Sequence, residues 1–142
     1  MEKVDVTAAI HILQQHHYKI TKQRQALLVY LAQHADFYIA LAAVDQHLRQ
    51  QFPTMSYDTI YRNVKEMQSI GIVETQVFKN GLRVKYQCDF SGPEHSHFIC
   101  QNCGRVKEIG FPDFNSIKDQ LQHYQVTAYQ VEVWGICESC LK

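Results

Sequence analysis

The sequence predicts an α+β fold with a helical first part and a smaller, cysteine-rich second part. Apolar residues recur at helical spacing in successive segments before residue 72, which predicts amphipathic helices. An Asn80-Gly81 dipeptide between β-branched residues indicates a hairpin after these helices. Two CxxC pairs near the end of the chain indicate a bound metal ion.

Composition sets limits on the class of protein. The 142 residues suit one ordinary domain or two small ones, and 46% of them are hydrophobic. Because no apolar run approaches the roughly 20 residues that cross a bilayer and the polar start shows no signal peptide, we expect a cytoplasmic protein without a membrane partner. Residues 1–89 carry ten Lys/Arg and eight Asp/Glu, and residues 90–142 carry four and six. This asymmetry is too small to establish a DNA-binding face by itself.

Two helices are predicted first. The first ends near Tyr18, and residues at helical spacing form its inner stripe: Val6, Ala9, Ile10, Leu13 and His17. Thr21 is a candidate N-cap of the second, whose inner face is formed by Leu27, Tyr30, Leu31 and His34.

A third and a fourth helix follow. Leu41, Val44 and Leu48 fit one stripe of the third helix, which ends before Pro53. Ser56 is the expected N-cap of the fourth helix, and Gly71 is expected to end it. Its buried stripe is formed by Ile60, Val64 and Met67, whereas its opposite face is aromatic and basic, with Tyr57, Tyr61, Arg62 and Lys65.

The hairpin spans Ile72 to Cys88, with a type I′ turn expected at Asn80-Gly81 because such a turn needs positive φ at both central positions. Basic side chains decorate it, namely Lys79, Arg83 and Lys85. Cys88 belongs to the inward-facing row formed by Leu82, Val84 and Tyr86. Helices followed by a basic hairpin predict a winged-helix DNA-binding domain over residues 1–88.

The second part begins after a predicted hinge at residues 89–94, which contains Gly92-Pro93. Strands are expected at 96–100, 106–109 and 126–135, with a helix opened by Pro112 and Asp113. A domain of about 50 residues is too small to be stable through its core alone. We therefore expect residues 95–142 to form an α/β domain stabilised by metal and by a partner subunit.

The paired CxxC motifs supply four thiolates, those of Cys100, Cys103, Cys137 and Cys140. Two short turns that each present two sulfurs suit a tetrahedral, closed structural zinc site. The alternatives are a redox dithiol and a set of small core residues.

A second metal site is suggested by Cys88, His95, His97 and Glu108. Thiolate, imidazole and carboxylate together suit Zn(II) better than Mg(II) or Ca(II). The alternative is that Cys88 binds no metal and is simply a small buried hydrophobic residue.

Candidate DNA contacts lie on the fourth helix and before the second. Tyr57 and Tyr61 could meet thymine methyl groups while Arg62 meets a guanine edge or phosphate, or the tyrosines could pack against other helices. Lys19 and Arg24 could contact phosphate or the minor groove, or could be solvated cations.

Four segments together resemble the ferric-uptake-regulator (Fur) superfamily of metal-responsive repressors over nearly the whole chain. They read KITKQR from Lys19, SYDTIYRN from Ser56, HSHFICQNCG from His95 and GICESC from Gly135. The resemblance implies a homodimer, a structural Zn(II) on the four paired cysteines and a regulatory metal held by His95, His97 and Glu108. It also implies operator binding through the fourth helix, which adds Thr59 and Asn63 to the candidate DNA contacts.

Two departures from the superfamily pattern concern the regulatory site. Cys88 stands where iron and peroxide sensors usually have a carboxylate, and Tyr38 stands where they have a histidine. A thiolate at this position is typical of the zinc-uptake-regulator branch, which also recruits an acidic residue near the base of the wing, for which Glu74 is the candidate.

The predicted function is that of a zinc-responsive homodimeric repressor with two Zn(II) per subunit and no small-molecule substrate. It would bind operator DNA of metal-uptake genes when its regulatory site is filled. One alternative is an iron, manganese or peroxide sensor of the same superfamily. Another is a zinc enzyme that uses Cys88, His95 and His97 with Glu108 as base, but the HxE and PCxxC signatures of nucleotide deaminases are absent.

Overall fold

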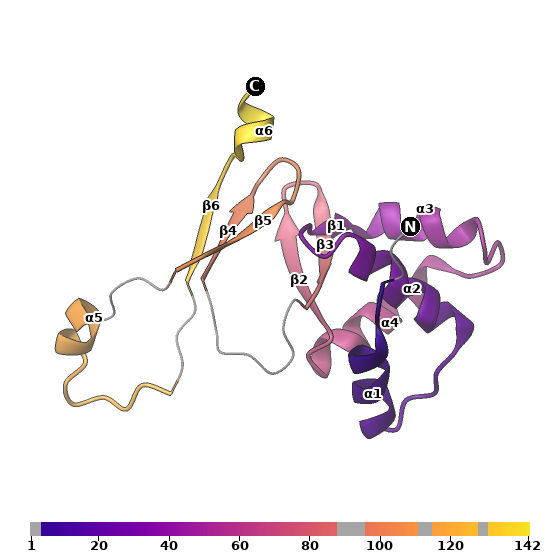
Figure 1. The fold of residues 1–142 in the computed structure, drawn as a ribbon, viewed down its shortest axis with the longest axis horizontal. Helices are drawn as coiled ribbons and strands as arrows, with labels where there is room; N and C mark the ends of the chain where they lie inside the picture. The colour runs from indigo at the N-terminus through magenta and orange to yellow at the C-terminus, as the bar shows by residue number, and fades with distance from the viewer. Residues whose placement is uncertain (1–3, 88–95, 111–114, 128–130) are drawn as a thin grey trace. The chain divides into compact units, whose positions relative to one another are not determined.

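The computed structural model describes residues 4–87, 96–110, 115–127 and 131–142 (Figure 1). The chain divides into two compact units, Met1–Ser91 and Gly92–Lys142. The predicted hinge and the candidate ligands Cys88 and His95 lie outside the described residues. Within the described ranges, no helix has both the length and the apolar character that a bilayer span requires.

The first unit contains the four helices α1 (Thr7–Gln15), α2 (Lys22–Gln33), α3 (Leu41–Arg49) and α4 (Tyr57–Ser69). Both predicted N-caps are confirmed, because the Arg24 amide donates to Thr21 Oγ1 at 3.1 Å and the Thr59 amide donates to Ser56 Oγ at 3.2 Å. Each cap satisfies one of the amides that have no partner within the helix.

Helices α1 and α4 end in the same way. The residue after each C-cap, His17 (φ 63°) or Gly71 (φ 82°), has the left-handed conformation. The amide of the following residue then donates a hydrogen bond to a carbonyl of the last helical turn. Tyr18 donates to Leu13 and Ile72 donates to Met67, both at 2.9 Å. This Schellman geometry confirms Gly71 as the end of α4. It also corrects the placement of His17, which is exposed beyond α1 and is not part of its inner stripe.

A three-stranded antiparallel sheet completes the first unit in the order β1-β3-β2, where β1 is Ile39–Ala40, β2 is Val73–Phe78 and β3 is Gly81–Tyr86 (Figure 1). The expected hairpin is present, but the prediction of a type I′ turn at Asn80-Gly81 is wrong. Phe78 pairs with Gly81, so Lys79 and Asn80 form the loop, and Asn80 does not have positive φ.

The core of this unit brings together the sheet and the predicted stripes of the four helices. His34 is a further correction, because it is the exposed C-cap of α2 and is not part of its inner face. Its largest members are fully buried aliphatic side chains, among them Leu13, Leu27, Leu31, Leu41, Leu48, Ile60 and Met67. Complete burial of each such side chain is worth roughly 1.5–3 kcal/mol. Lys85 differs from the sequence-based expectation, because it is 3% exposed and its Nζ donates to the Tyr86 carbonyl at 3.0 Å.

The second unit is built on a three-stranded sheet in the order β5-β4-β6. Strand β4 (Ser96–Cys100) runs antiparallel to β5 (Val106–Ile109) and parallel to β6 (Glu132–Gly135). The helices are α5 (Asn115–Gln120) and α6 (Glu138–Leu141) (Figure 1). The predicted helix after Pro112 and Asp113 is described as α5, and this helix has no buried residue within the described chain.

Candidate metal centre and nucleic-acid interface

The structure brings together the four paired cysteines of the second unit. Cys100, Cys103, Cys137 and Cys140 have Sγ atoms that all lie within 4.8 Å of one another. Within the described chain, this is the one group of three or more His, Cys, Asp or Glu side chains close enough to hold an ion.

The separations of the sulfurs fit a tetrahedral ion. Cys100 Sγ lies 3.9 Å from Cys140 Sγ, and Cys103 Sγ lies 3.7 Å from Cys137 Sγ. Four Zn–S bonds of about 2.3 Å in a tetrahedron require S···S distances of about 3.8 Å. A disulfide would require about 2.05 Å. The four residues are therefore free thiols in an arrangement that fits zinc.

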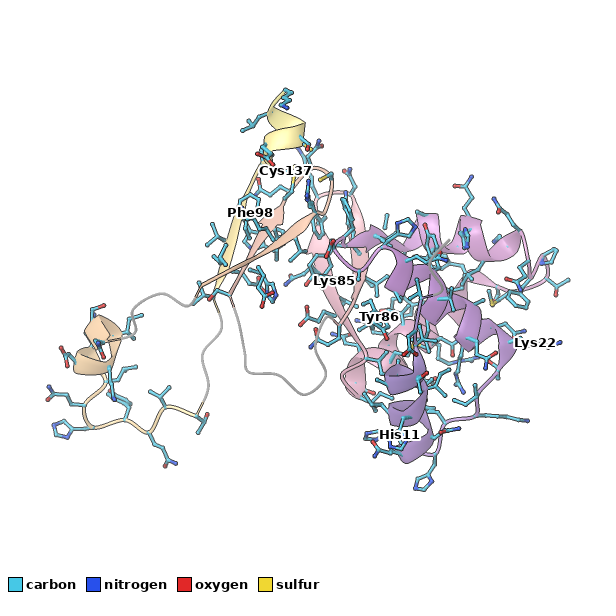
Figure 2. The ribbon with its side chains drawn as sticks, in the orientation of Figure 1. His11, Lys22, Lys85, Tyr86, Phe98 and Cys137 are labelled. Atoms are coloured by element: carbon cyan, nitrogen blue, oxygen red, sulfur yellow. The ribbon has the colours of Figure 1, made fainter. Side chains whose placement is uncertain are left out.

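Two turns position these sulfurs. Cys100 ends β4, and Gly104, with φ 82°, turns the chain back toward β5 after Cys103. Cys137 is the N-cap of the short helix α6, as its place at the start of that helix in Figure 2 shows, and Cys140 lies in the helix itself. The pairing of Cys100 with Gly135 in the parallel β4–β6 ladder brings the two CxxC segments to the same end of the sheet.

Gly135 has a steric role in this arrangement. A Cβ at this position would lie 3.1 Å from Phe98 Cε2, closer than most side-chain contacts allow. The Phe98 ring therefore lies against residue 135, where an added side chain would crowd it (Figure 2).

The thiols differ in acidity. Burial raises the pKa of Cys100, but N–H donors outweigh it and the pKa falls to about 6. These donors include the backbone amides of Cys103 and Cys137, whose nitrogens each lie 3.4 Å from Cys100 Sγ. Burial raises the pKa of Cys103 to about 12, and the neighbouring thiols act in the same direction. The cluster thus supports one thiolate readily, whereas a second negative charge beside it needs a cation.

The candidate regulatory residues that the structure describes lie on three strands, two of them in the second unit. His97 on β4 is directly opposite Glu108 on β5 and directly opposite Glu132 on β6. Paired residues share a face of the sheet, so both carboxylates flank the histidine. Glu132 was not predicted from the sequence, because the pairing of β4 with β6 is not visible in residue spacing.

Glu74, the other described candidate, lies on β2. Its Oε2 accepts a hydrogen bond from the buried Tyr38 hydroxyl at 3.4 Å. The residue that replaces the expected histidine therefore contacts the carboxylate proposed as an additional ligand.

The outer face of α4 carries the predicted DNA contacts. Tyr57 and Tyr61 are each 43% exposed, and Arg62 is exposed beside them. Lys65 Nζ lies 5.6 Å from the centroid of the Tyr61 ring. Such a mixed aromatic and basic surface suits thymine methyl groups, guanine edges and phosphates. Thr59 is half-buried, with its hydroxyl 2.9 Å from Ser56 Oγ.

Arg24 and Asn63 are placed differently. Asn63 is only 8% exposed, and its Oδ1 accepts a hydrogen bond from Arg24 Nε at 3.2 Å. Lys19, by contrast, is exposed. The assignment of these three residues to DNA contact stays a prediction.

The Ferric uptake regulator family profile matches residues 15–134 of the chain. The chain belongs to the ferric uptake regulator family. The ferric uptake regulation protein of Staphylococcus epidermidis is 33% identical over 132 residues, which cover 93% of each chain. The peroxide-responsive repressor PerR of Staphylococcus aureus is 32% identical over 139 residues, which cover 96% of this chain and 91% of PerR.

A solved structure of a zinc uptake regulator complexed with zinc and DNA has a TM-score of 0.69 and 25% identity, and the match covers 96% of this chain and 92% of that one. The fold is therefore that of the ferric uptake regulator family, with a winged-helix unit followed by a small α/β unit. Members of this family are metal-responsive transcription regulators, which excludes the zinc-enzyme alternative.

Proposed function

We propose that the chain is a cytoplasmic, zinc-responsive, homodimeric repressor that binds operator DNA of metal-uptake genes when its regulatory site is filled. The donor set carries the zinc assignment, because a thiolate from Cys88 would join the imidazoles of His95 and His97. The similarity to a zinc uptake regulator complexed with zinc and DNA supports the same function.

The first of two zinc ions per subunit is proposed for the four-cysteine cluster. Cys100, Cys103, Cys137 and Cys140 would hold it, since their sulfurs have the separations that a tetrahedral ion needs. Bound zinc would neutralise the thiolates and fix the two turns to each other. Because α5 has no buried residue and the sheet has three strands among the described residues, this cross-link would supply much of the stability of the second unit.

The second ion is proposed to regulate DNA binding. Cys88, His95, His97, Glu108 and Glu74 would hold it, with Cys88 and Glu74 from the first unit and the other three from the second. Shared ligation would favour those arrangements of the two units in which these donors meet. In a dimer, the same restriction would set the separation of the two α4 helices that read the half-sites. A shift of the population from 1:99 to 99:1 needs about 5.5 kcal/mol of differential binding, which several zinc bonds can supply.

The DNA contacts proposed for the filled state come from side chains that are exposed, or half-buried in the case of Thr59. Tyr57, Tyr61, Thr59 and Arg62 would face the major groove from α4, while Lys19 would contact the phosphate backbone. The formal net charge of the chain is zero, so affinity would depend on these local contacts and not on a general positive field.

An iron-, manganese- or peroxide-responsive repressor is the second candidate. It is favoured by the relatives with 33% and 32% identity, which are a ferric uptake regulation protein and a peroxide-responsive repressor. Against it stands Cys88, because a thiolate is a softer ligand than the carboxylate of iron sensors.

Substitution of Cys88 separates the candidates. Duplex DNA selected by the wild-type protein would be titrated with wild type and Cys88→Ser in buffers containing zinc, ferrous iron or manganese. Zinc-dependent binding that is lost in Cys88→Ser, with dimer and thermal stability unchanged, supports the zinc sensor. Iron-dependent binding that persists in the variant supports the second candidate. The exposed His123, substituted by Ala, provides a control that should leave metal-dependent binding unchanged.

A further inference from the structure

Arg24 connects the helix that carries the DNA-reading surface to the rest of the winged-helix unit. Its Nε donates to Asn63 Oδ1 at 3.2 Å and its Nη2 donates to Glu66 Oε2 at 3.0 Å. Both acceptors belong to α4, whereas Arg24 lies in the first turn of α2. The same guanidinium therefore contacts two residues that are one turn apart on the neighbouring helix.

The position of Arg24 is electrostatically unfavourable without these contacts. A cation in the first turn of a helix faces the positive end of the helix dipole, and the first turn of α2 contains no acidic residue. Glu66 supplies the missing negative charge from α4. The two side chains are only 16% and 30% exposed, so the pair is partly shielded from water and salt.

Asn63 makes the contact directional. It is the one polar residue among the buried positions of α4, which otherwise are Ile60, Val64 and Met67. Apolar packing alone allows a helix to slide or rotate slightly on its neighbour. A buried amide oxygen that must keep its donor restricts this freedom, because a buried acceptor without a partner is energetically costly. The paired contacts at Asn63 and Glu66 thus fix the rotation of α4 about its own axis as well as its distance from α2.

The third donor of Arg24 points to the segment before α2. Its Nη1 donates to the Lys19 carbonyl at 2.6 Å, and its guanidinium carbon lies 5.3 Å from the centroid of the Tyr18 ring. The side chain of Lys19 is exposed and is itself a proposed phosphate contact. Arg24 consequently holds two proposed DNA-binding segments, α4 and the residues at Lys19, in one arrangement.

We propose that Arg24 is a positioning residue of the DNA-reading surface, which sets base specificity by fixing α4 against α2 and does not itself contact DNA. This inference rests on the proposed binding of operator DNA through α4. It replaces a simpler role for Arg24, that of a phosphate contact. The two roles differ in whether a lysine could replace Arg24. A phosphate contact needs only a positive charge, whereas the positioning role needs the planar guanidinium that donates to three acceptors.

The test uses full-length, zinc-loaded protein and the duplex that the wild type selects from a pool with a randomised centre. Dissociation constants for this duplex and for an unselected duplex are measured over a range of salt concentrations for wild type, Arg24→Lys, Arg24→Gln and Glu66→Gln. Arg49→Lys is the matched control, since Arg49 pairs with Asp45 inside a single helix and links no two helices.

The positioning role predicts that Arg24→Lys weakens binding to the selected duplex by about tenfold or more, the equivalent of one lost base contact. Binding to the unselected duplex and the salt dependence of binding should stay unchanged in both Arg24 variants. Glu66→Gln, which keeps an acceptor oxygen but not its charge, should weaken specific binding to a smaller extent. Arg49→Lys should behave like wild type.

Other results would overturn the inference. If Arg24→Lys binds like wild type while Arg24→Gln lowers the slope of log K against log salt by about 0.9, Arg24 contacts a phosphate. If the Arg24 variants and Glu66→Gln only lower the melting temperature and bind the selected duplex normally where they are folded, the cluster is merely structural. If the wild type selects no duplex, the proposed function fails and the inference fails with it.

Discussion

Cys103 Sγ lies 3.7 Å from Cys137 Sγ, although the two residues are 34 positions apart in the chain. The sheet brings them together, because parallel pairing of β4 with β6 sets the first CxxC turn beside the start of α6. The cluster therefore depends on the fold, and the small second unit depends on the ion that the cluster is proposed to hold.

Removal of one sulfur should therefore destabilise this unit. Cys137→Ser should reduce the zinc content by one ion per subunit and lower the unfolding temperature of residues 92–142, because three thiols cannot close a tetrahedron. Zinc release to a chromogenic chelator and circular dichroism would measure both effects. Ser139→Ala, in the same turn, is the control. A Cys137→Ser variant that keeps its zinc and its melting temperature would contradict the structural role.

The pH dependence of zinc-free protein follows from the two shifted thiols. The pKa of Cys100 falls from 9.0 to about 6, so its contribution to stability is present above pH 9 and is lost as the pH falls through 6. The pKa of Cys103 rises from 9.0 to about 12, so its contribution is present below pH 9 and is lost as the pH rises through 12. In reducing, chelator-treated samples, the free energy of unfolding should increase between pH 6 and pH 9. Cys100→Ser should flatten this increase, and a wild-type profile as flat as that of the variant would show that the thiolate is not stabilised.

Gly135→Ala should destabilise the second unit by about 1–3 kcal/mol, because the added methyl group would press on the Phe98 ring at 3.1 Å. Thermal unfolding of the zinc-loaded protein measures the loss. Gly110→Ala is the control, since a Cβ there would have no neighbour within 4 Å among the described residues. Replacement of Phe98 by Leu should relieve the clash, so equal destabilisation of the single and double variants would speak against this contact.

Glu132 should support the proposed regulatory site through His97. A carboxylate beside a ligand histidine orients its ring and makes it more basic, and loss of such a neighbour typically costs 10–100-fold in metal affinity. Glu132→Gln should therefore weaken the second zinc ion by about 10–100-fold and leave the four-cysteine ion unchanged. Competition titrations with a zinc chelator measure both sites. Glu138→Gln, at an exposed position, is the control and should bind both ions like wild type. Unaltered affinity of both sites in Glu132→Gln would exclude a role of Glu132 in supporting His97.

Features set by neighbouring residues were predictable from the sequence. The N-caps Thr21 and Ser56 and the helix end at Gly71 follow from local hydrogen bonding and backbone preference, and all three are confirmed. The proximity of the four cysteines was also expected, because two CxxC pairs at this spacing are typical of a shared metal site.

Features set by distant contacts were not predictable. Strand β1 has two residues, too few for a periodic pattern, and exists because Ile39 pairs with Val84. The burial of Lys85 contradicts the alternation expected for an exposed wing. Arg24 was predicted to contact DNA or to be a solvated cation, and its contacts with α4 were not predictable because the acceptors are 39 and 42 positions away.

The number of zinc ions per subunit tests the central claim most directly. Native mass spectrometry of the zinc-loaded dimer should show two ions per subunit in the wild type and one in Cys88→Ser, with the four-cysteine ion retained. A wild-type dimer that binds a single ion per subunit at saturating zinc would contradict the claim, because no second site would then exist through which zinc could control DNA binding.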